Sequence, residues 1–77
     1  MADVTQELET RIVTALPGAV VQVSAHGGGH FSIEVKSPLF AGKGTLARHR
    51  LVLSAIAPLM AGDAAPVHAV DKLVTEE

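Results

Sequence analysis

Cysteine, tryptophan and tyrosine are absent from this 77-residue sequence, and phenylalanine occurs only twice. Without cysteine the chain can form no disulfide, no thiolate metal site and no cysteine nucleophile, and it fits a reducing compartment. With so few aromatic rings, aliphatic side chains must build the core. The same scarcity leaves little support for stacking on nucleic-acid bases.

Long apolar runs and a strong net charge are also missing. No apolar run approaches the roughly 18 residues of a membrane-spanning helix. The N-terminus lacks the basic and then apolar pattern of a signal peptide. We therefore expect a cytoplasmic protein with no membrane segment. A formal charge of −2 gives no overall attraction to nucleic acid.

What remains is the composition of one small folded domain. Hydrophobic residues make up 48% of the chain and charged residues 18%, a balance typical of globular proteins. A chain of 77 residues is large enough for one core. We expect a single domain over residues 1–77 that is monomeric in isolation.

The first helix is predicted from its start and stop signals. Asp3 is a suitable N-cap, and Gln6 follows at the spacing of a capping box. Pro17 and Gly18 end the helix. Its apolar stripe repeats every four residues and consists of Val4, Leu8, Ile12 and Leu16.

Strands are predicted at residues 19–24, 31–36 and 67–74, where apolar or β-branched residues recur. A glycine-rich loop from His26 to His30 should join the first two strands as a hairpin. A helix joins the second strand to the third, so these two are parallel if they are neighbours. With a short helical turn near residues 38–40, the predicted order is α-β-β-α-α-β, an α+β domain with a three-stranded mixed sheet.

The second helix is predicted from Thr45, taken as its N-cap, to about Ala61. Pro58 should kink or shorten its last turn. Arg48 and Arg50 fall on opposite edges of the apolar face, and we expect both at the surface. That face is formed by Leu46, Val52, Leu53, Ile56, Leu59 and Met60.

His49 lies near the middle of the apolar face of this helix. Buried polar groups are normally hydrogen-bonded. We therefore interpret His49 as a structural, core-facing histidine whose ring nitrogens are satisfied, in preference to a ligand or catalytic group.

Three of the four histidines should converge at one rim of the sheet. Parallel strands start at the same edge, which places His68 near His30, and the loop carrying His26 lies at that edge too. Neutral imidazole ligates zinc, iron and copper, so a metal site is one interpretation. The alternative is a glycine-rich loop that merely has polar residues on either side. Three glycines would make the loop mobile, so a partner that supplies further ligands suits it better than metal binding alone.

Two apparent catalytic motifs are incomplete. His26-Gly27-Gly28-Gly29 spells an esterase oxyanion sequence, but no G-x-S-x-G is present and the chain is too short for that fold. Gly42-Lys43-Gly44-Thr45 lacks the first glycine of a phosphate-binding loop. We therefore expect no enzymatic activity.

Four short motifs together resemble those of a known family: Ser37-x-x-Phe40-x-Gly42, Arg48-His49-Arg50-Leu51-Val52, Val67-His68-Ala69 and His30-Phe31. The combination is similar to the BolA family over nearly the whole chain. The resemblance implies a class II KH-like fold with helices on one face of the sheet. It also implies a monothiol glutaredoxin partner. In such complexes a 2Fe–2S cluster is held by the glutaredoxin cysteine, by glutathione and by BolA side chains.

The resemblance also implies metal ligands by position. His68 corresponds to the C-terminal cluster ligand of the family. The second ligand comes from the hairpin loop, where this chain offers His26, with His30 as a second candidate. We favour His26 because three glycines would let it adjust to a metal, whereas the strand fixes His30.

Other residues take structural or surface roles by the same comparison. Phe40 and Gly42, like His49, are expected to be structural. The positive helix start, with Lys43, Arg48 and Arg50, corresponds to a region assigned to nucleic-acid or partner contact. Departures from the family occur at Pro58, at residues 61–65 and in the short tail after Thr75, and they bear on partner choice.

Two functions follow from these observations. The first is an iron–sulfur adaptor, because a histidine rim without cysteine requires a thiol-bearing partner. The second is a DNA-binding transcriptional regulator of the kind described among bacterial BolA proteins, in which the basic helix start contacts DNA weakly. A protein-interaction module without a metal role is a third possibility.

Overall fold

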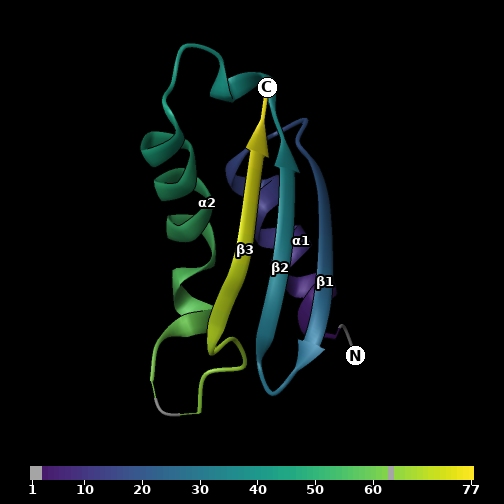
Figure 1. Ribbon diagram of the computed structural model, residues 1–77. Helices are drawn as coiled ribbons and strands as arrows, with labels where there is room; N and C mark the ends of the chain where they lie inside the picture. The colour runs from purple at the N-terminus through teal and green to yellow at the C-terminus, as the bar shows by residue number, and fades with distance from the viewer. Residues whose placement is uncertain (1–2, 63) are drawn as a thin grey trace.

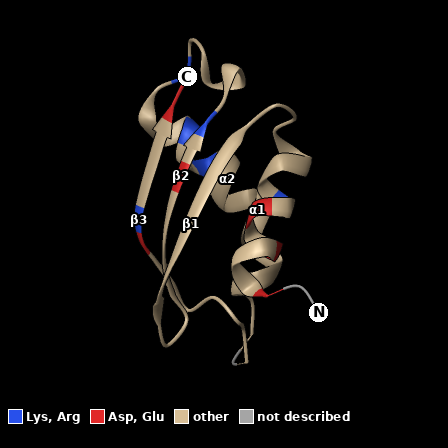
Figure 2. Cartoon of the chain, turned by 90° about the vertical axis from the view of Figure 1, so that its right-hand side faces the viewer, with Lys and Arg blue, Asp and Glu red and all other residues tan. Residues whose placement is uncertain are grey.

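The computed structural model describes residues 3–62 and 64–77. Its elements follow the order α1 (Val4–Ala15), β1 (Val20–Gly27), β2 (His30–Lys36), the 3₁₀ turn η1 (Pro38–Phe40), α2 (Thr45–Met60) and β3 (Ala69–Glu76). This confirms the predicted α-β-β-α-α-β order. Both helices cover the same face of the sheet, and the other face is open (Figures 1 and 2).

Helix α1 begins and ends as its sequence predicts. The Asp3 carboxylate accepts a hydrogen bond from the Gln6 backbone N–H at 2.8 Å, which caps the first turn. Leu8, Ile12 and Leu16 are buried in the core. The α1 stripe thus supplies one side of the layer beneath the sheet.

The sheet has the strand order β1-β2-β3, with an antiparallel β1–β2 pair and a parallel β2–β3 pair. Phe31, Ile33 and Val35 alternate with exposed or half-buried residues and point into the core. The parallel crossover predicted from the sequence is therefore confirmed. It brings the starts of β2 and β3 to one end of the molecule (Figure 1).

The hairpin is tighter than predicted. Strand β1 continues to Gly27, so the connection is a turn at Gly28 and Gly29 and not a loop of five residues. Positive φ angles at all three glycines make this close reversal possible. The pairing register shifts between Ala25 and Gly27, which leaves His26 at a bulge.

Helix α2 differs from its prediction in its cap and in its buried face. Gly44, not Thr45, is the N-cap, and no side chain caps this end. Val52, Ile56 and Leu59 are buried. Leu46 and Leu53, which the helical wheel placed on the same face, are 64% and 37% exposed. Pro58 lies inside the helix, which continues to Met60.

Strand β3 is displaced by two residues relative to its prediction. It runs over Ala69–Glu76, so His68 precedes the strand and does not lie on it. At the far end the Ser37 N–H donates to the Glu76 carbonyl at 2.9 Å, which prolongs the pairing into the expected polar tail. No helix within the described residues is long and apolar enough to cross a membrane.

Candidate metal-binding site at the histidine end

The backbone of the β1–β2 turn holds the backbone of His68 in place. The N–H groups of His68 and Ala69 both donate to the Gly29 carbonyl, at 2.8 and 3.2 Å. The His68 side chain is exposed. Gly29 has a φ of +80°, and a Cβ added there would collide with the His68 ring. The turn glycine is therefore required by this close approach as well as by its backbone angle.

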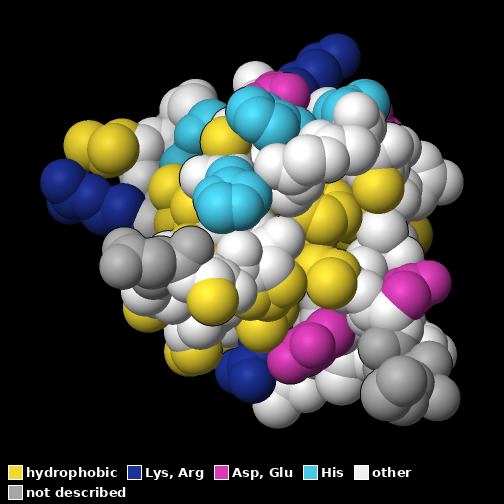
Figure 3. Space-filling view, turned by 90° about the horizontal axis from the view of Figure 1, so that it is seen from below, with side chains coloured by type: hydrophobic (Ala, Val, Ile, Leu, Met, Phe, Trp, Pro, Cys, Tyr) yellow, Lys and Arg dark blue, Asp and Glu magenta, His cyan; other side chains and the backbone are white. Residues whose placement is uncertain are grey.

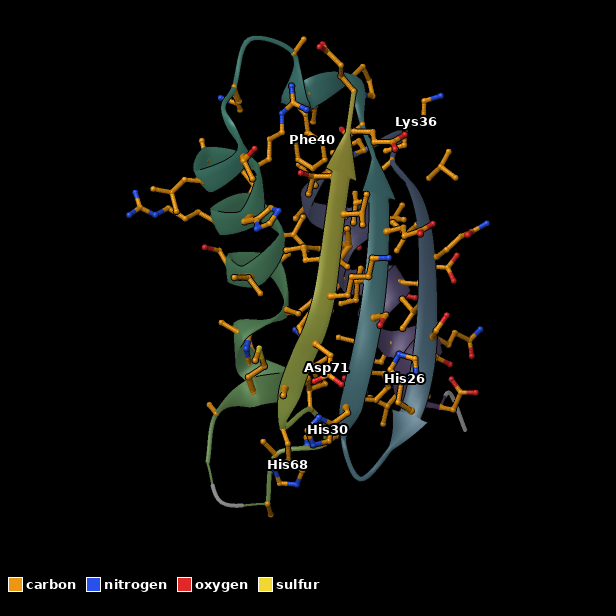
Figure 4. All side chains as sticks on the ribbon, viewed as in Figure 1. His26, His30, Lys36, Phe40, His68 and Asp71 are labelled. Carbon is orange, nitrogen blue, oxygen red and sulfur yellow. The ribbon has the colours of Figure 1, made fainter. Side chains whose placement is uncertain are left out.

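His30 forms the best-defined side-chain contact at this end of the molecule. Its Nδ1 lies 2.9 Å from Asp71 Oδ1, and both side chains are about half exposed. The parallel register aligns His30 with Ala69 and skips Asp71, which becomes the extra residue of a bulge in β3. The carboxylate occupies Nδ1, and Nε2 of His30 has no hydrogen-bond partner among the described residues; Figure 4 shows His30 beside Asp71.

His26 lies apart from these two histidines. It belongs to β1, and its Nε2 lies 2.6 Å from Ser32 Oγ on the open face of the sheet. Figure 4 shows His26 on the other side of β2 from His68. The expectation that a mobile loop carries His26 is therefore wrong, since ladder pairing on both sides of the bulge fixes its backbone.

We call the surface formed by His30, His68, Asp71 and the turn glycines the histidine end. In the view from below, histidine side chains lie near one another on the surface, next to exposed hydrophobic side chains (Figure 3). Across residues 3–62 and 64–77, however, no three His, Cys, Asp or Glu side chains are grouped so that they could hold a metal ion. The predicted convergence of three histidines into one site is thus not found, and the described residues by themselves offer no complete ligand set.

His49 is half-buried on α2. Its predicted hydrogen bonds are not found among the described residues. Because the ring retains partial contact with solvent, its nitrogens do not require protein partners.

Arg48 is engaged within the protein and does not lie free at the surface as predicted. Its Nε donates to the Lys43 carbonyl at 2.7 Å, and its guanidinium lies 5.9 Å from the centre of the buried Phe40 ring. The side chain is only 19% exposed and forms an ion pair with Glu77 at 3.7 Å. Lys43 and Arg50 are exposed. The predicted basic cluster therefore offers two free cations and not three.

The spacing of Ser37, Phe40 and Gly42 has a local structural cause. The Ser37 hydroxyl caps η1 by accepting from the Leu39 N–H at 3.1 Å. Phe40 is fully buried, and Gly42 has a φ of +76°. These residues shape the approach to α2, as expected for a structural role.

Sequence reasoning missed Asp71 and Ser32 as partners of the histidines. Asp71 lies three residues after His68, on a strand correctly predicted to be parallel to β2. The pairing register of β2 with β3 was therefore the signal that could have identified Asp71. Its contact depends on a bulge that no residue pattern in β3 marks.

Comparison with known proteins identifies related sequences and folds. A sequence model of the family described as BolA-like protein matches residues 6–76. A BolA protein homologue from Coxiella burnetii is 30% identical, with a TM-score of 0.74, and the match covers 97% of this chain and 92% of that one. Yeast Fra2 is 31% identical, with a TM-score of 0.63 and coverage of 100% and 83%.

A third solved structure is informative for the fold alone. The BolA domain of SufE1 from Arabidopsis thaliana has a TM-score of 0.80 at 19% identity, and the match covers 99% of this chain and 93% of that one. No curated protein sequence matches the chain.

Proposed function

The chain belongs to the BolA-like family, and from this premise we propose that it is an iron–sulfur adaptor. It binds a monothiol glutaredoxin and contributes histidine ligands to a 2Fe–2S cluster shared with that protein and glutathione. Its part in the complex is to present ligands and a docking surface, with no catalytic step of its own.

The observation that carries the proposal is the pair of exposed imidazoles, His30 and His68, on adjacent strand starts in a chain without cysteine. Imidazole nitrogen is a good ligand for iron, whereas iron–sulfur clusters are held mainly by thiolates. A surface with two imidazoles and no thiol fits such a cluster only if a partner supplies the remaining ligands. The exposure of both rings leaves room for that partner.

The contacts favour His30 over His26 as the companion of His68. His30 pairs in register with Ala69, the neighbour of His68, whereas His26 lies on a strand that does not contact β3. Metal-bound histidines commonly donate their second ring N–H to a carboxylate. Asp71 is placed to accept such a bond from His30 Nδ1.

The roles of the residues follow from these contacts. Asp71 fixes the tautomer and orientation of His30 so that Nε2 faces outward, and Gly29 holds the backbone of His68 through its carbonyl. The His30 ring and the His68 backbone are therefore positioned before a partner arrives, which lowers the ordering cost of binding. When bound, the cluster supplies a transferable iron–sulfur unit with redox activity.

The test is the visible spectrum of the chain reconstituted with a monothiol glutaredoxin, glutathione, iron and sulfide. We expect a heterodimer whose spectrum differs from that of the glutaredoxin homodimer. His68→Ala and His30→Ala should each remove that difference, whereas His49→Ala, which removes a histidine on α2, should preserve it.

His26→Ala separates the two candidate ligands on the hairpin. If His30 is the ligand, the His26→Ala heterodimer keeps its spectrum. A spectrum that changes with His26→Ala and survives His30→Ala would assign the ligand role to His26. A spectrum unaffected by His68→Ala would overturn the proposal.

The DNA-binding alternative has weaker support. Lys43 and Arg50 remain available to phosphates, but Arg48 is held by Lys43, Phe40 and Glu77. Two free cations at the helix start of a chain of net charge −2 give little electrostatic affinity for DNA.

A further inference from the structure

A groove on the outer side of α2 exposes an apolar surface that no other element of the described residues covers. It is a shallow, open groove with a volume of about 530 Å³, lined chiefly by Lys43, Leu46, Ala47, Arg50, Leu51 and Ser54. We call it the α2 groove. Leu46 is 64% exposed and Leu51 37% exposed. These side chains point away from the core, which Val52, Ile56 and Leu59 contact from the opposite side of the helix.

The charge of the α2 groove has one sign. Lys43 and Arg50 lie among its lining residues, and no Asp or Glu does. The sequence itself has no acid between Glu34 and Asp63. Arg50 forms no salt bridge with any other described residue, in contrast to Arg48. An occupant with acidic residues beside an apolar stripe would match this surface.

The backbone of α2 determines what kind of segment can fill the groove. Beyond the first turn, whose N–H groups no side chain caps, its N–H and C=O groups are engaged within the helix, so the groove offers mainly side chains. An extended segment bound there would gain few backbone hydrogen bonds from the protein, whereas a helix satisfies its own. We propose that the α2 groove binds an acidic amphipathic helix of a partner protein.

Two other occupants fit the groove less well. A second copy of this chain in a two-fold arrangement would place Lys43 and Arg50 against the same patch of its partner, where like charges repel. A nucleic acid would satisfy those cations but would place phosphates over Leu46 and Leu51. The groove follows the first half of α2, which lies near Phe40 and away from the histidine end (Figures 1 and 4). The two surfaces can therefore be occupied together.

The probe is a synthetic peptide of about 18 residues, or five helical turns. It carries Leu at i, i+3, i+4 and i+7 and Glu on both flanks. Titrated into the ¹⁵N-labelled full chain, it should shift the amides of residues 43–54 in a saturable manner and leave those of His30 and His68 unchanged. The same peptide with Lys in place of Glu should bind at least about tenfold more weakly.

Variants locate the site on the chain. Leu46→Ser combined with Leu51→Ser, and separately Arg50→Glu, should each weaken binding by about tenfold or more. Val20→Ser is the matched control, because Val20 is 63% exposed but lies on β1, and it should leave affinity unchanged. Unchanged histidine-end amides in each variant verify that the fold is intact.

Four results would overturn the proposal. The first is the absence of saturable amide shifts, and the second is equal affinity for the Lys and Glu peptides. The third is a loss of affinity in Val20→Ser as large as that in the groove variants. The fourth is displacement of the peptide by a DNA duplex at a lower concentration than unlabelled peptide requires. The last would reassign the groove to nucleic acid. Neither glutaredoxin nor a cluster takes part in this experiment, so its outcome is independent of the ligand assignment at the histidine end.

Discussion

At the scale of single residues, the histidines are distinguished by their neighbours more than by their position in the sequence. His26 and His30 stand on either side of three glycines, yet one contacts Ser32 and the other Asp71. The sequence supported a prediction that His30 and His68 lie at one end of the sheet, because that followed from strand direction. It could not predict which histidine would have a carboxylate partner, because a bulge in β3 determines this.

The first prediction concerns Asp71. Asp71→Asn keeps the side-chain size but removes the anionic acceptor, so the Nδ1–H tautomer of His30 should lose its preference. We expect the ¹⁵N ring shifts of His30 to move toward a tautomer mixture while those of His26 stay unchanged. Stability should fall by less than about 1 kcal/mol, because both partners are half exposed. A His30 spectrum identical to that of the wild type would show that Asp71 does not orient the ring.

The second prediction concerns the cap of α1 and its pH dependence. Hydrogen bonds from the Thr5 hydroxyl and the Gln6 N–H lower the pKa of Asp3 below its usual value. A lowered folded-state pKa means that this stabilisation is present above the unfolded pKa and is lost as the pH falls through the folded one. Asp3→Ala should therefore lower the melting temperature near neutral pH.

The difference in melting temperature between Asp3→Ala and the wild type should become smaller at a pH well below the ordinary aspartate pKa of about 3.9. Thermal denaturation of the two proteins, near neutral pH and at the low pH, measures this difference. Thr14→Ala, on the exposed side of the last turn of α1, serves as a control whose effect should not follow this pH dependence. A difference in melting temperature that stayed the same at both pH values would refute the role assigned to the Asp3 carboxylate.

At the scale of elements, the prediction succeeded where a segment has one apolar face. Helix α1 and strand β2 each present a single apolar face to the core, and both were predicted with the correct face. Helix α2 has apolar residues on two faces, so a helical wheel could not show which one is buried. The partly buried Arg48 lies on the core side, and the apolar Leu46 lies on the solvent side.

The third prediction tests the close approach at the β1–β2 turn. Gly27 and Gly29 have similar φ angles, +85° and +80°, but only Gly29 is crowded by His68. Gly27→Ala should carry the backbone strain alone, whereas Gly29→Ala should carry that strain and displace His68. We expect Gly29→Ala to reduce the free energy of unfolding by about 1–3 kcal/mol and by more than Gly27→Ala. Urea denaturation measures the free energy of unfolding of both variants. Equal reductions would show that His68 can move aside at no cost in free energy.

At the scale of the whole molecule, the two proposed binding surfaces lie toward opposite ends. The strand starts bring His30 and His68 together, and the first half of α2 carries Lys43 and Arg50 toward the other end. The net charge of −2 predicted weak binding to DNA, but the number of free cations at the helix start depended on the contacts of Arg48. These contacts join residues distant in sequence, so local pattern could not reveal them.

The last prediction separates the three cations. Lys43 and Arg50 are exposed, so any duplex DNA binding should depend on them, and each alanine substitution should lower the slope of log K against log salt by about 0.9. Arg48→Ala should leave that slope nearly unchanged. It should instead lower the melting temperature, because the guanidinium contacts the Lys43 carbonyl, the Phe40 ring and Glu77. Arg11→Ala is the control, since Arg11 lies on α1 and pairs with Glu7. If Arg48→Ala reduced the slope as much as Arg50→Ala while stability stayed constant, Arg48 would be a phosphate contact and its internal partners would be incidental.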